Sequence, residues 1–357
     1  MPKAKITSIK DVAALANVSI STVSHVLNRS KNVSSGLSKR VMDAVEELGY
    51  EINPIASGLK SGKTNMIGVV VTTIANIFYS ELLHSIHAAA LKKNYNVCIY
   101  ETQQNLEHEI RYIDVLKSRW VEGILLTSCL DTDRPEAPGY IKKLTTLNIN
   151  RKRIPVVCID AAISETLDAV TADNRVAMFK ATQHMFDIGK RNIAYVAAPF
   201  YFQNGKDRKM GYLDALQRNS APIRQEFIVE GDFSPESGAA CMRKLLSLGL
   251  PIDGVAVGSD QMGVGVIWEL KQRGFRIPQD IAVTGFDDNF PATLISPSLS
   301  TMRVSKEKLG SYAFDLLIER INNPGAPRKL VELESELIVR QSTDFEKETA
   351  WSLKEWS

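Results

Sequence analysis

Apolar residues near the start of the chain recur every three or four positions. The segment IKDVAALANVSISTVSHVLN (9–28) holds two such stripes, which predict two short helices. Asn17, Val18 and Ser19 separate the stripes, because Asn tolerates the left-handed conformation of a tight turn and Ser can cap the second helix. Leu37, Val41, Val45 and Leu48 predict a third helix over 35–48 that ends at Gly49. The pattern is typical of a helix-turn-helix head.

Beyond residue 63 the pattern changes to short apolar runs separated by helical stretches. Such alternation predicts parallel sheets joined by right-handed helical crossovers. The runs fall into two sets that divide near residues 160–172, so we expect an α/β body with two lobes. The predicted strands are 66–72, 96–101, 123–127, 155–159, 192–198, 253–258 and 280–285.

Charge is distributed unevenly along the 357 residues. Residues 1–63 hold nine basic and five acidic residues, a net charge of +4, which leaves −2 for the rest of a chain whose total is +2. A basic head on a mildly acidic body suits contact with phosphates at one end only. The second predicted helix exposes a short polar face suited to reading base edges: Ile20, Ser21, Ser24, His25 and Asn28.

Other patterns argue against enzymes, metal centres and membranes. The four cysteines, at 98, 129, 158 and 241, have no metal-ligand spacing and suit a reduced protein. The five histidines form no catalytic or metal pattern, and neither a P-loop nor a GxSxG motif occurs. No apolar run has membrane-spanning length. We therefore expect a cytoplasmic protein, associated with the nucleoid when bound to DNA, that is not an enzyme and has no cofactor.

Two segments resemble the LacI/GalR family of bacterial transcriptional regulators: TSIKDVAALANVSISTVSHVLN and EELGYEINPIASGLKSGKTNMIGVVV. The resemblance extends over nearly the whole chain and implies a body of two Rossmann-like lobes, like periplasmic sugar-binding proteins, joined by three crossings. The implied domains are a head at 7–52, a hinge at 53–63, a body at 64–344 and a tail at 345–357. Within the body, lobe 1 is expected at 64–163 and 303–325, and lobe 2 at 164–302 and 326–344.

The resemblance assigns DNA contacts to the head and the hinge. It places base readout at Ile20, Ser21 and His25, where the histidine resembles the purine-repressor branch and replaces an arginine of many members. Leu59 matches the hinge leucine that wedges into the minor groove, and it follows Gly58, a residue unfavourable inside a helix. Ser24 completes the reading face, and four polar residues are expected to contact phosphates: Thr22, Asn28, Arg29 and Lys31.

Ligand contacts are expected at the carboxyl ends of the strands, where parallel-sheet folds bind ligands. Phe78 and Tyr79 can stack on a ligand ring or pack in the core, and Asp260 either caps a helix or contacts the ligand. Arg208 and Phe233 match family positions for hydrogen bonding to the ligand and for covering it. The full expected set is Phe78, Tyr79, Asp160, Asn204, Arg208, Phe233, Asp260 and Asp287.

The expected function is a homodimeric regulator, most simply a repressor, that binds a pseudo-palindromic operator and responds to a small molecule. Phe202 stands where the purine-repressor branch has an arginine, and with Phe200 and Tyr201 it favours a sugar or glycoside over a purine or nucleoside. Whether the ligand acts as an inducer or a corepressor is open at this point. A solute-binding protein would share the body but would have no use for the basic head.

Overall fold

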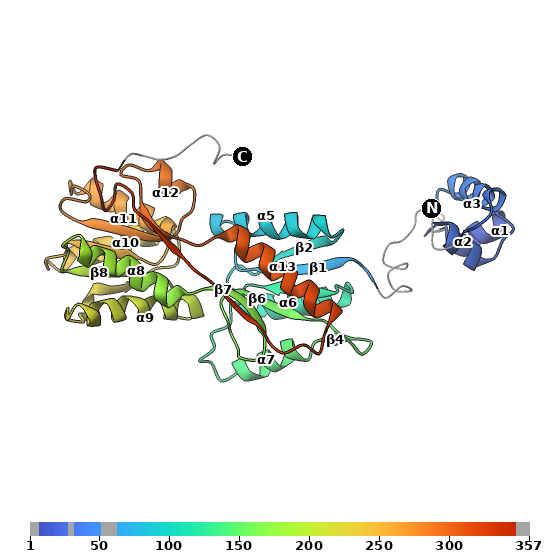
Figure 1. Cartoon of the computed structure of the whole chain (residues 1–357), viewed down its shortest axis with the longest axis horizontal. Helices are drawn as coiled ribbons and strands as arrows, with labels where there is room; N and C mark the ends of the chain where they lie inside the picture. Colours follow the sequence, from blue (N-terminus) through green and yellow to red (C-terminus); the bar gives the residue numbers. More distant parts are fainter. Residues whose placement is uncertain (1–6, 28–31, 51–62, 348–357) are drawn as a thin grey trace, which may run out of the picture. The chain divides into compact units, whose positions relative to one another are not determined.

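The computed structural model describes residues 7–27, 32–50 and 63–347 (Figure 1). The chain divides after Thr64 into two compact units. Asn28, Arg29, Lys31 and Leu59, which we predicted to contact DNA, lie outside the described residues, as does Gly58.

The first unit contains the three predicted helices, α1 (Ile9–Leu15), α2 (Ile20–Leu27) and α3 (Ser35–Leu48). Their apolar stripes meet in a small core around Val12, Val23 and Val41, each fully buried. Small residues at this core, such as Ala13 and Ala44, let the three helices approach closely.

The turn between α1 and α2 has the chemistry that the sequence predicts. Asn17 has a left-handed backbone with φ 48°, and Ser19 Oγ accepts a hydrogen bond from Thr22 N over 3.1 Å, which caps α2. Arg40 on α3 donates from Nη2 to the carbonyls of Ala16 and Asn17, so the turn is also fixed from the third helix. α3 ends at Gly49, whose φ of 57° is the left-handed C-cap expected of glycine.

Lobe 1 of the second unit is built on a six-stranded parallel sheet. α5 (Ile77–Lys92) and α13 (Lys306–Asn322) pack on each other and on one face, while α6 (Leu106–Ser118) and α7 (Ala137–Thr145) lie on the other face. A two-stranded hairpin, β4 (Asn148–Ile149) and β5 (Lys152–Arg153), precedes β6. The strand order is β13 (Leu330–Leu333), β7 (Asp168–Ala172), β6 (Val156–Asp160), β3 (Gly123–Leu126), β1 (Met66–Val71) and β2 (Asn96–Glu101).

Lobe 2 repeats this layered arrangement. Its sheet is parallel except for the edge strand β14, which runs antiparallel to β12. The strand order is β14 (Glu336–Ile338), β12 (Ser300–Arg303), β11 (Ala282–Asp287), β10 (Gly254–Val257), β8 (Ile193–Ala197) and β9 (Ile228–Glu230). The helices of lobe 2 are α8 (Asn174–Asp187), α9 (Gln203–Arg218), α10 (Pro235–Ser247), α11 (Asp260–Gln272), α12 (Pro291–Leu294) and a 3-10 turn η1 (Gln225–Phe227).

The two-lobed α/β body is confirmed, but the strand pairing differs from the expected lobe boundaries. β7 pairs with β6, and β13 pairs with β7, so residues 168–172 and 330–333 belong to lobe 1 rather than lobe 2. β12 pairs with β11 in lobe 2 and ends at Arg303. The chain therefore crosses between lobes after residues 172, 303 and 333. The physical reason is that β6 and β7 are parallel neighbours joined by only seven residues, 161–167, without the helix that usually marks such a connection.

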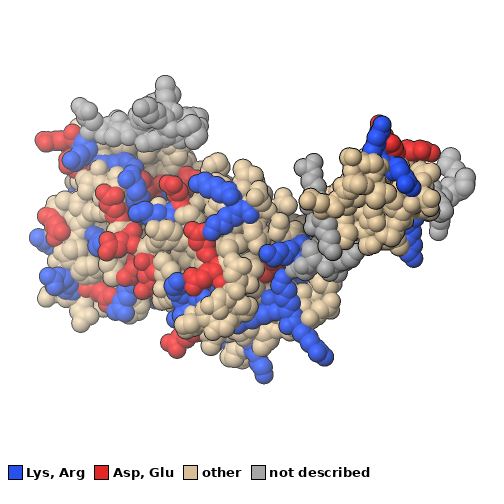
Figure 2. Space-filling model, turned by 45° about the vertical axis from the view of Figure 1, so that its right-hand side comes forward, with Lys and Arg blue, Asp and Glu red and all other residues tan. Residues whose placement is uncertain are grey.

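Charged side chains of both signs cover much of the face of the body seen in Figure 2, where Lys and Arg also gather in one region. No described helix has the length and apolar character that a membrane crossing requires.

Candidate effector cavity and DNA-reading helix

A cavity lies between the two lobes at the carboxyl ends of their strands. Seven of the eight predicted ligand residues line it, the exception being Asp260. Lobe 1 contributes from the ends of β1, β2 and β6, and lobe 2 from the segments that follow β8 and β9 and from the end of β11. Its complete lining is Thr72, Thr73, Asn76, Phe78, Tyr79, Gln104, Asp160, Phe202, Asn204, Arg208, Phe233 and Asp287.

Four of these residues have backbones in the left-handed region, among them Gln104 with φ 58°. Asp160 has φ 72°, Phe233 has φ 73° and Asp287 has φ 103°. Non-glycine residues rarely adopt such angles, and strain of this kind concentrates where a side chain must be aimed at a ligand. The sharp turns direct both carboxyls, each at the end of a buried strand, into the space between the lobes.

Arg208 is held rigidly at the centre of the cavity wall. Its guanidinium donates from Nε to Asn174 Oδ1 over 2.8 Å, from Nη1 to Gly258 O over 2.6 Å and from Nη2 to Asp287 Oδ1 over 3.4 Å. Its planar face stacks on the Phe286 ring, with Cζ 3.7 Å from the ring centroid. The fixed fork is suited to hydrogen bonds with ligand oxygens.

Burial sets the protonation of the two cavity carboxyls. It raises the pKa of Asp287 to about 7, an effect that Arg208 opposes and Asp160 reinforces. Burial also raises the pKa of Asp160, while Arg208 and Asn204 lower it. The cavity therefore contains two carboxyls and one guanidinium, a set that can accept hydrogen bonds from hydroxyl groups as well as donate to them.

Asn204 joins the lobes within this polar set. Its Nδ2 donates to Asp160 Oδ2 over 2.8 Å, whereas its Oδ1 is buried and has no hydrogen-bond partner in the described part of the chain. Burying an oxygen without a hydrogen-bond partner costs free energy, so a ligand that donates a hydrogen bond to Oδ1 binds more tightly.

Aromatic rings form the apolar part of the site. The ring centroids of Phe202 and Phe233 are 5.9 Å apart, and those of Tyr201 and Phe202 are 4.5 Å apart. Tyr201 Oη also donates to Gln104 Oε1 in lobe 1 over 2.9 Å, which makes a second polar bridge between the lobes. Such rings can cover the apolar face of a sugar ring.

Asp260 has a structural environment rather than a place on the cavity wall. Ser259 is the N-cap of α11, with its Oγ accepting from Met262 N. Asp260 begins the helix and is 1% exposed, and its carboxylate accepts from Thr301 Oγ1 over 2.6 Å and from Asn289 N over 2.7 Å. Both of its oxygens are therefore used to tie β12 and the segment after β11 to α11.

The structure adds five lining residues that we did not predict as ligand contacts: Thr72, Thr73, Asn76, Gln104 and Phe202. All five follow the end of a strand, which is the signal that could have found them. Asn76 also caps α5 by accepting from Phe78 N over 3.0 Å. Its position is thus coupled to that of the neighbouring aromatic pair, Phe78 and Tyr79.

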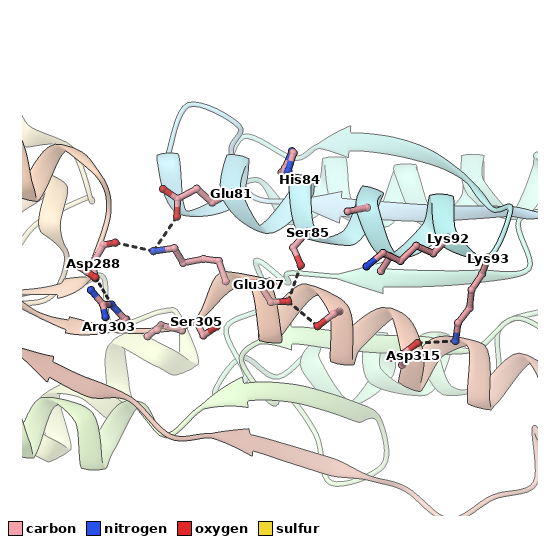
Figure 3. A pocket seen from close by; sticks show the side chains of 15 residues that line it. Glu81, His84, Ser85, Lys92, Lys93, Asp288, Arg303, Ser305, Glu307 and Asp315 are labelled. Atoms are coloured by element: carbon pink, nitrogen blue, oxygen red, sulfur yellow. Dashed lines mark hydrogen bonds and ion pairs between the residues drawn. The ribbon is translucent and has the colours of Figure 1, made fainter. Parts of the chain in front are cut away.

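A larger open groove runs beside α5 and the start of α13 (Figure 3). Its charged side chains bind each other: Lys306 contacts Glu81 over 3.0 Å and Lys93 contacts Asp315 over 2.8 Å. Lys306, which is nearly buried, also donates to the carbonyl oxygens of Asp287 and Asp288. This groove brings together none of the predicted ligand residues, but it shows how the start of α13 is tied to the segment after β11.

The predicted reading face of α2 is only partly exposed where it is described. Ile20 is 42% exposed and Ser21 is exposed, whereas Thr22, Ser24 and His25 are half-buried. Ser19 Oγ lies 2.7 Å from Ser21 Oγ and 2.8 Å from Thr22 Oγ1, so a hydroxyl cluster lies at the start of the helix. These groups can donate to phosphates or to base edges, as the first turn of a recognition helix does.

A helix-turn-helix head attached to a two-lobed ligand cavity defines a DNA-binding regulator controlled by a small molecule. Family models match both parts: bacterial regulatory proteins of the lacI family at residues 8–53 and a periplasmic binding protein-like domain at residues 182–343. Catabolite control protein A of Priestia megaterium is 33% identical over 94% of this chain and 99% of its own length. The HTH-type transcriptional repressor PurR of Pasteurella multocida is 31% identical over 94% and 98%. The chain belongs to the LacI family and is a DNA-binding transcriptional regulator.

Solved structures agree with this assignment. A lac repressor dimer bound to operator and the anti-inducer ONPF matches with a TM-score of 0.82 and 25% identity, over 95% of this chain and 99% of that one. A complex of the transcriptional regulator CelR with cellobiose matches with a TM-score of 0.70 and 30% identity, over 94% and 99%. The similarity covers head and body together.

Proposed function

We propose that this protein is a homodimeric repressor controlled by a neutral sugar or glycoside bound between the lobes. The observation that carries the ligand class is Asn204, whose buried Oδ1 requires a hydrogen-bond donor from the ligand. Asp160 and Asp287 add acceptors, Arg208 adds fixed donors, and Phe202 and Phe233 supply rings for an apolar face. A sugar presents hydroxyl donors and acceptors around a ring with an apolar face and so matches all three features.

Similar proteins support the proposal. CelR binds cellobiose in its solved complex. A periplasmic binding protein/LacI transcriptional regulator from Alkaliphilus metalliredigens was solved in complex with D-xylulofuranose. It is 27% identical to this chain with a TM-score of 0.66, and the match covers 77% of this chain and 98% of that one. The lac repressor match is a dimer on its operator, which favours two heads on a pseudo-palindromic site. Among relatives, PurR is named a repressor.

The test is a calorimetric binding screen with neutral mono- and disaccharides, their phosphate esters, and purine bases and nucleosides. We expect a neutral sugar to bind, Arg208→Met to weaken that binding about 10- to 100-fold, and the bound sugar to change affinity for a DNA duplex selected by the protein. If only purine bases or nucleosides bind, the effector is a purine or nucleoside and not a sugar. Sedimentation of the DNA complex gives the number of protomers, for which we expect two.

A further inference from the structure

One edge of lobe 1 is strongly basic. It is the edge at which the strands of the parallel sheet begin, and the ends of α6 and α7 and the β4–β5 hairpin meet there. Asn150 and Arg151, with φ of 47° and 67°, form the tight turn of the hairpin and expose the basic residues around it. We call this surface the basic edge; its members, all exposed, are Lys117, Arg119, Lys142, Arg151, Lys152 and Arg153.

Most of this charge has no internal counter-ion. Lys117, Arg119, Lys142 and Arg151 have no carboxylate within ion-pair distance among the described residues. Lys143, just behind them, pairs with Asp114 over 2.9 Å and so adds no net charge. Blue side chains gather at this end of lobe 1 in Figure 2. A surface with several unneutralised cations attracts polyanions and loses that attraction as salt is added.

The chain that leads to the DNA-binding head enters the body at the same edge. Met66 begins β1 there, Glu122 N donates to Met66 O over 2.8 Å, and Glu122 Oε1 accepts from Asn65 N over 2.7 Å. Glu122 lies only three residues after Arg119. Residues 51–62 are all that separates the described part of the head from this point, so the head is tethered to this edge of the body by a segment that spans at most about 43 Å when fully extended.

We infer that the basic edge of lobe 1 is a second DNA-contacting surface. It binds phosphates that flank the bases read by the head, and it does so without regard to sequence. Duplex DNA carries one negative charge per roughly 1.7 Å of its axis, so a cluster of this size contacts several phosphates at once. The inference rests on DNA binding by the head and assigns to the body a share of the affinity, but none of the specificity.

The test compares two double variants of the full chain. Arg119→Gln with Arg151→Asn removes two charges from the basic edge, and Asn suits the left-handed backbone of position 151. Arg218→Gln with Lys244→Gln removes two exposed charges from the ends of α9 and α10, where the strands of the other lobe begin. Both are measured on a duplex selected by the wild-type protein, with flanks of about 10 base pairs on each side.

We expect the basic-edge variant to show a weaker dependence of the DNA-binding constant on salt. Each phosphate contact that is lost reduces the slope of log K against log salt concentration by about 1, so a dimer should lose about 2 to 4 in total. Trimming the flanks removes its difference from wild type, and its base preference is unchanged. The lobe 2 variant keeps the wild-type slope. Equal slopes for the two variants on the flanked duplex overturn the inference. The same result is expected if the basic edge binds an acidic protein and not DNA. Wild-type protein without salt-sensitive DNA binding would instead contradict the regulatory function itself.

Discussion

Asn204 of lobe 2 donates its Nδ2 hydrogen to Asp160 Oδ2 of lobe 1 over 2.8 Å, while its own Oδ1 is buried without a partner in the described chain. One amide thus joins the two lobes and offers an acceptor to whatever lies between them. The Asn204 side chain can therefore contact the opposite lobe and a bound ligand at the same time.

Replacing Asn204 by Ala is expected to weaken sugar binding about tenfold, because the variant has neither the hydrogen bond to the ligand nor the bridge between the lobes. Calorimetric titration with the sugar found in the screen measures the change. Gln217→Ala, at an exposed position on the same helix, is the control and should leave the affinity unchanged. Equal affinities for the two variants would contradict the role of Asn204.

The Asp287 carboxyl makes stability depend on pH. Its pKa of about 7 in the folded chain lies above the value of about 3.9 for an exposed aspartate, so the folded state takes up the proton first. The stabilisation by the neutral carboxyl is complete below about pH 4 and is lost as pH rises through about 7. Asp287→Asn removes this contribution.

Between pH 6 and pH 8 the free energy of unfolding should therefore fall by about 1 kcal/mol more in the wild type than in Asp287→Asn. Urea titrations of both proteins without ligand give the two differences. Burial also raises the pKa values of Asp160 and Asp260, which are present in both proteins. The Asp287 charge raises the pKa of Asp260 further, so its loss in Asp287→Asn also lowers the pKa of Asp260, and this change adds to the difference between the two proteins. Identical pH dependence would show that Asp287 is not the group involved.

Local pattern was sufficient for the head and for seven strands of the two large sheets, β1, β2, β3, β6, β8, β10 and β11. The three head helices agree with the predicted spans, and β2 covers the predicted residues 96–101. Five strands of the two large sheets, β7, β9, β12, β13 and β14, were not predicted. β13 pairs with β7 across more than 150 residues of sequence, as in Val331 with Val170, and no local periodicity reports such a contact.

The candidate site was predictable to the extent that it follows strand ends. Gln104 and Phe202 obey the same rule and could have been included. The side-chain direction of Asp260 could not be predicted from the sequence, because it depends on hydrogen bonds from Thr301 and Asn289. These two residues come close to Asp260 only when the sheet of lobe 2 has formed. The same holds for Lys206, whose partners belong to the other lobe.

Lys206, two residues before Arg208, forms an ionic bridge across the cleft. Its Nζ contacts Asp131 Oδ1 over 3.0 Å and also Asp133, both in lobe 1. Lys206→Met should destabilise the closed arrangement and weaken sugar binding about threefold at low salt, with the difference disappearing at high salt. Lys93→Met, which breaks a pair of similar length with Asp315 inside lobe 1, should have no effect on the titration. A loss of affinity that persists at high salt would exclude the ionic explanation.

His25→Arg in α2 is expected to change base preference without changing ligand affinity. Arginine contacts guanine through two parallel hydrogen bonds, so one symmetric position of the selected duplex should shift to guanine with about 5- to 100-fold discrimination. Sequencing of duplexes selected from a random pool measures this. Lys39→Arg, on the exposed side of α3, keeps the head charge and should retain the wild-type preference. An unchanged preference in His25→Arg would remove His25 from base readout.

Gly211 on α9 lies where the helix crosses α8, and it keeps Arg208 in its place. A Cβ at this position would collide with the backbone carbonyl of Arg175, which cannot move without shifting α8. Gly211→Ala should therefore lower the free energy of unfolding by about 1–3 kcal/mol and also weaken sugar binding, because α9 carries both Asn204 and Arg208. Gly139→Ala, at an exposed position of α7 with open space around it, should instead be neutral or stabilising by up to about 1 kcal/mol. Urea denaturation and calorimetry of the two variants separate the outcomes: if Gly211→Ala lost stability but kept full sugar affinity, the packing of α9 on α8 would support the fold without positioning the cavity.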